Sequence, residues 1–206
     1  MKKIILLTTI ALMGLCATMV AQNNTTDEGI IINGIKWATR NVATPGKFAA
    51  NSEDAGEYYQ WNKGTTDFLF NDDYYDSVYA DAASWLSAND PCPAGWRVPT
   101  LEEIEKLLDE DKVSNEWITV NGINGRKFTD KTTGNSIFLP AAGYRDDLGG
   151  KLYDVGDSGV YWGSTQYDSD DYNAYSLYFV SDSDLASGLD WNYKCLGRSI
   201  RPVAEK

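Results

Sequence analysis

The sequence predicts a single α+β domain in which many short strands and long irregular loops accompany one clear helix. Three observations support this prediction. The chain has 206 residues, of which 43% are hydrophobic, which suits one folded domain and excludes disorder throughout. Short apolar or aromatic runs alternate with turn-forming strings such as Asn-Gly and Gly-Gly. Only the segment near residues 100–110 carries clear helix signals, and no repeat period or second domain boundary is present.

The N-terminus has the pattern of an export signal. Two lysines precede an apolar run over Ile4–Leu15, and a small-residue region ends near Ala21. The run is short and interrupted, which disfavours a membrane anchor. Cys16 leaves a lipoprotein as an alternative, which the bulky residue before it disfavours. We expect a signal peptide over residues 1–21, a flexible segment over 22–29 and one domain over 30–203, with no transmembrane segment in the mature chain. The protein would be exported to the cell surface or outer membrane, or secreted.

Charge and residue usage exclude several classes of function. The chain has 30 acidic and 18 basic residues, a formal net charge of −12 and no histidine. An excess of acids disfavours nucleic-acid binding, because phosphates require clustered Lys and Arg. The lack of histidine removes Ser-His and Cys-His nucleophile pairs and histidine metal sites. After cleavage, Cys92 and Cys195 remain. Two cysteines in an exported chain usually pair, so we predict a disulfide, with two unpaired thiols as the alternative.

The first half of the chain begins with a hairpin. Ile30–Ile32 and Ile35–Trp37 flank Asn33-Gly34, a two-residue turn signal. Thr44–Glu57 is rich in turn-forming residues and predicts a long loop. An aromatic strand is expected at Tyr58–Trp61. The following acidic, tyrosine-rich stretch, residues 71–83, predicts irregular structure with a short helix around Ala80–Leu86.

A capping box marks the start of the clear helix. Thr100 stands at the N-cap and Glu103 three residues later, so each side chain can satisfy the other's backbone N–H. Leucine and isoleucine then recur on one helical face. Beyond this helix the pattern predicts strands at Trp117–Val120, Gly125–Thr129, Ser136–Pro140, Val160–Trp162, Ala174–Phe179 and Ser199–Val203.

Five motifs occur in a characteristic order. They are Asn33–Val42 (NGIKWATRNV), Cys92–Thr100 (CPAGWRVPT), Leu139–Arg145 (LPAAGYR), Tyr161–Thr165 (YWGST) and Gly197–Val203 (GRSIRPV). Their order and spacing resemble the Fibrobacter succinogenes major paralogous domain family, exported surface proteins abundant in gut Bacteroidetes. The resemblance covers nearly the whole mature chain, from about Ile30 to Val203.

The resemblance implies a C-type-lectin-like fold. That fold would have a small mixed or antiparallel sheet, one or two helices and a loop-rich C-terminal half that presents a binding surface. Many family members carry a cysteine where Pro202 stands here, which puts the pairing of Cys92 with Cys195 in doubt. The motif tryptophans are expected in the core. The motif glycines Gly95, Gly143 and Gly163 are expected where unusual backbone dihedrals are needed.

The segment Gln166–Lys194 is the predicted binding surface. Of its 29 residues, 18 are Tyr, Asp, Ser or Asn, the types that antibody paratopes use for rigid contact area and adaptable hydrogen bonds. Strand alternation assigns Tyr175, Leu177 and Phe179 to the core and Ser176 and Tyr178 to the exposed face. The candidate ligand-binding residues are Tyr167, Asp168, Ser169, Asp170, Asp171, Tyr172, Asn173, Ser176, Tyr178, Ser181, Asp182, Ser183, Asp184, Asp190, Trp191, Asn192 and Tyr193.

The predicted function is non-enzymatic recognition of a surface protein or glycan, as in an adhesin. The segment's composition also resembles the variable region of retroelement-diversified proteins. The alternatives are ordinary solvated loops on a passive structural component of the envelope or of a filament, and a carboxylate-based glycan hydrolase. No catalytic residue is assigned. The resemblance places the chain in a branch of the C-type-lectin-like fold that also contains formylglycine-generating enzymes, whose reactive cysteines have no matching pair here. We expect no cofactor. The alternative is calcium, held by acidic residues of the segment: Asp168, Asp170, Asp171, Asp182, Asp184 and Asp190.

Overall fold

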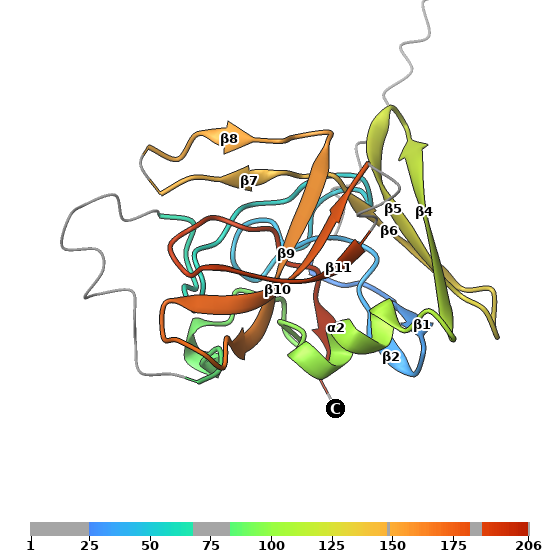
Figure 1. Cartoon of the computed structure of the whole chain (residues 1–206), viewed down its shortest axis with the longest axis horizontal. Helices are drawn as coiled ribbons and strands as arrows, with labels where there is room; N and C mark the ends of the chain where they lie inside the picture. The colour runs from blue at the N-terminus through green and yellow to red at the C-terminus, as the bar shows by residue number, and fades with distance from the viewer. Residues whose placement is uncertain (1–24, 68–82, 148, 182–186, 206) are drawn as a thin grey trace, which may run out of the picture.

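A computed structural model describes residues 25–67, 83–147, 149–181 and 187–205 (Figure 1). The expected signal peptide and the candidate residues Asp182, Ser183 and Asp184 lie outside the described residues. Within them, the architecture is mostly antiparallel β-sheet with one short α-helix. No helix of the described chain is long and apolar enough to cross a membrane.

The first sheet joins the two ends of the domain. Strands β1 (Ile30–Ile32) and β2 (Ile35–Trp37) form the predicted hairpin. The turn residues Asn33 and Gly34 both have positive φ, 45° and 79°, as a tight hairpin turn requires. The sheet has the order β1-β2-β12-β3, with β12 at Val203–Ala204 and β3 at Trp96–Arg97. Of the strand predicted over 199–203, only its last residue lies in β12, and of the preceding residues only Ser199 forms an isolated bridge, with Tyr161.

Helix α2 (Leu101–Leu108) begins at the predicted capping box. The Thr100 hydroxyl accepts from the Glu103 N–H at 3.4 Å, and Glu103 Oε2 accepts from the Thr100 N–H at 2.9 Å. The Glu103 carboxylate also accepts two hydrogen bonds from Arg97, at 2.6 and 2.8 Å. The start of the helix is therefore fixed by hydrogen bonds that link Arg97, Thr100 and Glu103. The described part of the short helix expected around Ala80–Leu86 is not helical; a 3-10 turn, η1, follows at Ser87–Asn89.

Two further sheets follow α2 in the chain. One has the order β4-β5-β6, with β4 at Val113–Val120, β5 at Ile123–Asp130 and β6 at Ser136–Pro140. The short hairpin β7 (Tyr144–Arg145) and β8 (Leu152–Tyr153) stands apart from it (Figure 1). The last sheet has the order β11-β10-β9, with β9 at Ser158–Gln166, β10 at Asn173–Val180 and β11 at Ser187–Tyr193.

The β9-β10-β11 sheet divides the core into two parts. Tyr161, Leu177 and Phe179 face a cluster built with α2 and the β4-β5-β6 sheet. Trp162 and Ala174 face a second cluster that holds Tyr59 and Trp61 from the aromatic segment. The motif tryptophans Trp37, Trp96 and Trp162 are all buried, as predicted. The sheet therefore packs against an apolar cluster on each face over part of its length. Side chains on the rest of the sheet can line a binding site.

The predicted disulfide is absent, since no bond joins Cys92 and Cys195. Cys92 contacts the buried cluster around Phe48 and Trp96. Cys195 lies after β11, where its Sγ is 3.5 Å from Asp147 Oδ2. The two thiols belong to separate packing clusters.

Candidate ligand-binding site

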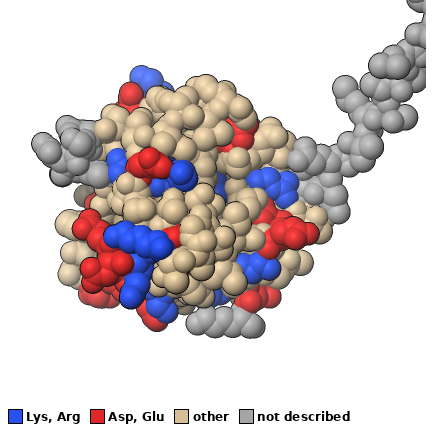
Figure 2. Space-filling view, turned by 90° about the vertical axis from the view of Figure 1, so that its right-hand side faces the viewer, with Lys and Arg blue, Asp and Glu red and all other residues tan. Residues whose placement is uncertain are grey.

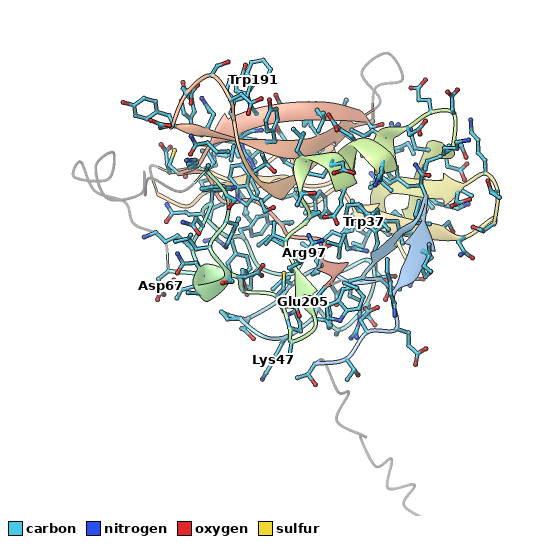
Figure 3. The ribbon with its side chains drawn as sticks, turned by 90° about the horizontal axis from the view of Figure 1, so that it is seen from below. Trp37, Lys47, Asp67, Arg97, Trp191 and Glu205 are labelled. Atoms are coloured by element: carbon cyan, nitrogen blue, oxygen red, sulfur yellow. The ribbon has the colours of Figure 1, made fainter. Side chains whose placement is uncertain are left out.

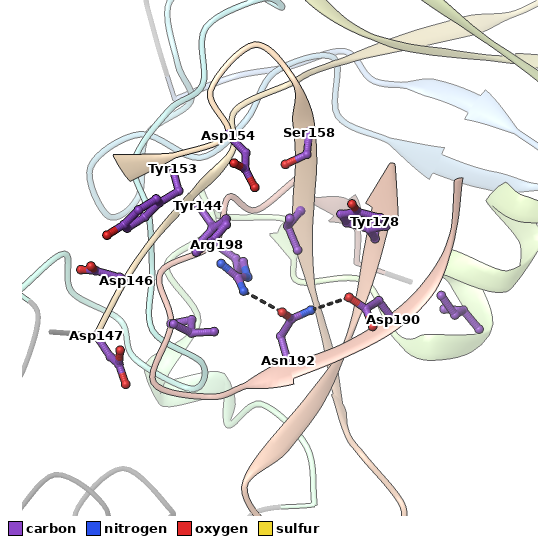
Figure 4. Close-up of a pocket in the computed structure, with 13 residues that line it drawn as sticks. Tyr144, Asp146, Asp147, Tyr153, Asp154, Ser158, Tyr178, Asp190, Asn192 and Arg198 are labelled. Atoms are coloured by element: carbon purple, nitrogen blue, oxygen red, sulfur yellow. Dashed lines mark hydrogen bonds between the residues drawn. The ribbon is translucent and has the colours of Figure 1, made fainter. Parts of the chain in front are cut away.

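A cavity of about 810 Å³ opens between the β7-β8 hairpin and the β9-β10-β11 sheet (Figure 4). This volume lies within the range of ligand pockets in proteins. Tyrosines, aspartates, one arginine and a few aliphatic side chains line it: Tyr144, Asp146, Asp147, Tyr153, Asp154, Ser158, Val160, Tyr178, Leu189, Asp190, Asn192, Leu196 and Arg198.

Strand register decides which predicted residues reach the cavity. In the β10-β11 pair, Ser176 lies opposite Asp190, and Tyr178 lies opposite Gly188. Successive side chains of a strand point to opposite faces, so Tyr178, Asp190 and Asn192 share the cavity face. Trp191 pairs with Tyr175 and points the other way. The predicted binding residues on this strand pair therefore lie on two opposite faces of the sheet, and only one of these faces lines the cavity.

Arg198 is a buried cation that is only partly satisfied. Its Nη2 donates to Asn192 Oδ1 at 2.6 Å, and its guanidinium lies 4.4 Å from the Tyr144 ring centroid. Its Nε and Nη1 find no acceptor among the described residues, and no described carboxylate forms an ion pair with it. Burial lowers the pKa of Arg198 to about 10, so the group stays charged at neutral pH. Such a buried cation favours an added acceptor.

Ser158 supplies a second unsatisfied polar group. Its side chain is buried at the start of β9, and its Oγ has no hydrogen-bond partner in the described chain. The backbone around it is fixed, because its N–H donates to the Asp154 carbonyl and its own carbonyl accepts from Gly143 N. Figure 4 shows the Ser158 side chain on the same wall as Asp154. A buried hydroxyl without a partner costs about 1–3 kcal/mol, so it needs an explanation.

Two tyrosines of the β7-β8 hairpin form the wall that faces the sheet, and a third tyrosine lies on the sheet itself. Tyr144 and Tyr153 pair across β7-β8, with their rings stacked at 5.5 Å between centroids and 22° between planes. Tyr178 stands on the sheet side (Figure 4). Burial raises the pKa of Tyr178, and the carboxylates of Asp154 and Asp190 raise it further. The Tyr178 hydroxyl therefore stays protonated and can donate a hydrogen bond.

The carboxylates of the cavity are held in different ways. Asp190 accepts from the Trp191 N–H at 2.9 Å and from Asn192 Nδ2 at 3.1 Å. Asp146 accepts from the Lys151 N–H at 2.9 Å. Asp154 is exposed at the rim and has a positive φ of 56°. Among the described residues, no group of three or more Asp, Glu or Cys side chains is placed to hold a metal ion.

Two other predicted residues, Tyr167 and Trp191, form an aromatic patch with Tyr175 on the opposite face of the β10-β11 pair. Trp191 stacks on Tyr167 at 5.0 Å between centroids, and Tyr167 meets Tyr175 edge-on at 5.3 Å. Trp191 is 52% exposed, and Figure 3 shows it at the outer margin, away from buried Trp37. We call Tyr167, Tyr175 and Trp191 the aromatic patch. Tyr175 is half-buried here rather than in the core as predicted.

The remaining candidates play structural roles or lie at the surface. Asp170 accepts from the N–H groups of Tyr172 and Asn173, which closes the β9-β10 turn. The prediction that Ser176 is exposed is wrong, because central strand β10 is covered on that face and Ser176 is fully buried. Its Oγ accepts from Asn192 Nδ2 at 2.9 Å. The exposed candidates without a cavity contact are Asp168, Ser169, Asp171, Tyr172, Ser181 and Tyr193.

Sequence reasoning missed most of the cavity wall. Ser158 and Arg198 lie just outside the segment that its composition marked, and Tyr144 belongs to the motif Leu139–Arg145, for which no binding role was predicted. The one signal in the sequence was an arginine within the motif Gly197–Val203. Arginine is rarely buried without a partner, so a buried arginine there would point to a site. Charge on the surface gives no clearer guide. On the face seen in Figure 2, acidic and basic side chains lie among broad uncharged areas.

Every residue that lines the cavity falls between Tyr144 and Arg198. Residues 106–203 match a family described as Domain of unknown function (DUF8237). The matched stretch begins within α2 and ends at β12, so it contains the cavity together with the β7-β8 hairpin and the β9-β10-β11 sheet that frame it. No curated protein and no solved structure matches the chain.

Proposed function

We propose that this protein is exported to the bacterial cell surface and recognises a protein or glycan there without catalysing a reaction. The observation that carries the proposal is that Ser158 and Arg198 both line the same cavity. Both side chains are buried, and both keep polar atoms without partners among the described residues. Proteins rarely leave such groups unsatisfied, and sites that must bind a ligand are a recurrent exception.

The composition of the cavity supports recognition. Tyrosine supplies large contact area at low conformational-entropy cost, and Asp, Asn and Ser supply adaptable hydrogen bonds. The cavity combines the two kinds of side chain on the β7-β8 hairpin and the β9-β10-β11 sheet.

We also propose that the domain is a variant of the C-type-lectin-like fold, within or near the Fibrobacter succinogenes major paralogous domain family. Support comes from the five motifs, which lie in one framework whose described residues form one α-helix and mostly antiparallel sheets. The C-terminal half supplies the cavity, in line with the binding surface that the resemblance implies.

Two variants on opposite sides of β11 test the proposal. Tyr178→Ala removes one aromatic side chain that lines the cavity. Trp191→Ala removes the exposed ring of the aromatic patch. The purified protein and both variants are applied to an array of glycans and extracellular proteins, and their melting temperatures are measured in parallel. We expect Tyr178→Ala to lose binding and Trp191→Ala to keep it, with both variants folded.

Other outcomes are equally clear. Loss of binding only in Trp191→Ala would move the site to the aromatic patch. No binding by the folded wild-type protein to any glycan or protein would support a passive structural component of the envelope. Hydrolysis of an arrayed glycan that is lost on replacement of Asp190 or Asp154 would make the protein a hydrolase and overturn the non-enzymatic role.

A further inference from the structure

We propose that the cavity ligand presents a neutral sugar ring, rather than an acidic or an amino group. This inference rests on the proposed recognition function and specifies its ligand class. It follows from three properties of the cavity: its charge, its unsatisfied hydrogen-bonding groups and its aromatic wall.

Charge argues against an acidic ligand. Four aspartates line the cavity, against Arg198 and the neighbouring Lys151, whose Nζ lies 4.7 Å from the Tyr153 ring centroid. A carboxylate that approached Arg198 would also meet the carboxylates of Asp154 and Asp190, which influence that arginine electrostatically. The net field is therefore repulsive for an anion.

The tyrosine faces argue against an amine. An aromatic ring attracts a cation through its negative face. Here Arg198 already lies over Tyr144, and Lys151 already lies over Tyr153. The aspartates would attract an ammonium group, but it would meet these two resident cations instead of a vacant cage, and it has no acceptor to offer the unpartnered nitrogens of Arg198. A neutral ligand avoids both penalties.

The hydrogen-bonding groups favour hydroxyls. Arg198 Nε and Nη1 need acceptors, whereas Asp154 and Asp190 offer only acceptor atoms. The Ser158 hydroxyl can act in either direction. A sugar hydroxyl both donates and accepts, so neighbouring hydroxyls of one ring can satisfy the arginine and a carboxylate together. An apolar ligand would leave these groups unpaired at a cost of about 1–3 kcal/mol each.

The cavity also offers apolar area for the C–H face of a ring. Val160, Leu189 and Leu196 line it beside the stacked pair of Tyr144 and Tyr153. Mixed apolar walls with a few converging polar groups are typical of small-molecule sites. We therefore expect the C–H face of the sugar ring to lie against these aliphatic side chains, at the edge of the stacked tyrosine pair, with its hydroxyls toward Ser158 and Arg198.

Ligand-observed NMR with three classes of sugar tests the inference. The probes are neutral methyl hexosides and N-acetylhexosamines, the acidic sugars glucuronic and N-acetylneuraminic acid, and the amino sugar glucosamine. We expect binding to the neutral class, with an affinity that changes little between low and high salt, because no ion pair forms. Ser158→Ala should weaken this binding on the order of tenfold, and Arg198→Met by that factor or more.

Arg126→Met is the matched control. Arg126 is also a buried arginine with an unpartnered Nε, but it lies on β5, where it donates to Asn115 and Val180. This variant should keep sugar binding even if it loses stability. If Arg198→Met fails to fold, Ser158→Ala decides the matter alone.

The outcomes separate this inference from the broader proposal. Binding of only acidic or amino sugars, sensitive to Tyr178→Ala, would overturn the neutral-sugar inference and leave the recognition site intact. Binding only to arrayed proteins through Tyr178 would do the same. Neutral-sugar binding that is unchanged in Ser158→Ala would show that these groups do not hold the ring.

Discussion

Ser158→Ala deletes one oxygen atom at the cavity wall and should make the ligand-free protein more stable. The Ser158 side chain is 3% exposed, and its Oγ has no partner among the described residues. A buried unpaired hydroxyl costs about 1–3 kcal/mol, so its removal should raise the free energy of unfolding by about 1 kcal/mol. For a chain of this size, that corresponds to a rise of about 2–4 °C in melting temperature.

Ser176→Ala is the matched control in the neighbouring strand. Ser176 is equally buried, but its Oγ accepts from Asn192 Nδ2 at 2.9 Å. Removing this satisfied hydroxyl should lower the free energy of unfolding by about 1 kcal/mol. Urea unfolding followed by circular dichroism measures both variants. Equal destabilisation by both substitutions would show that Ser158 is satisfied in the free protein and would refute the reasoning.

Three further predictions concern the framework. Burial alone would raise the pKa of Glu103, but its hydrogen bonds to Arg97 and Thr100 lower that pKa below the usual 4.5. The ionised Glu103 side chain therefore stabilises the folded protein fully above pH 4.5. This contribution is lost as the pH falls through the lowered pKa. Glu103→Gln should therefore flatten the acid side of the melting-temperature profile, and an unchanged slope would contradict this. Gly159→Ala should cost about 1–3 kcal/mol in urea unfolding, because its Cβ would lie 2.1 Å from Phe179 Cζ; a near-neutral effect would refute that contact. Because no disulfide joins the two cysteines, a reductant should leave the melting temperature unchanged, and a fall of several degrees would reveal a bond.

Local signals in the sequence predicted local structure well. The Asn33-Gly34 turn and the capping box at Thr100 are each specified by residues within one turn of each other, and both are confirmed. The strand predicted at Ser136–Pro140 matches β6 in its bounds. Such features depend on backbone preferences and short-range hydrogen bonds, which a sequence shows directly.

Features that depend on distant partners were predicted less well. Strand β11 was not predicted, because its polar residues match loop composition, and its pairing with β10 supplies the order. That pairing also buries Ser176 and splits the predicted surface into a cavity side and the aromatic patch. The wall from Tyr144 to Tyr153 reaches the cavity only through the β7-β8 hairpin, and its short strands give no periodic signal.

The most direct test of the cavity as the recognition site is methyl NMR during titration with the array's strongest binder. Val160, Leu189 and Leu196 line the cavity, whereas Ile104 and Leu107 of α2 are buried in the core. Recognition at the cavity predicts saturable shifts of the first three methyl groups, with those of α2 unmoved. Saturable binding that shifts none of the cavity methyls would contradict it.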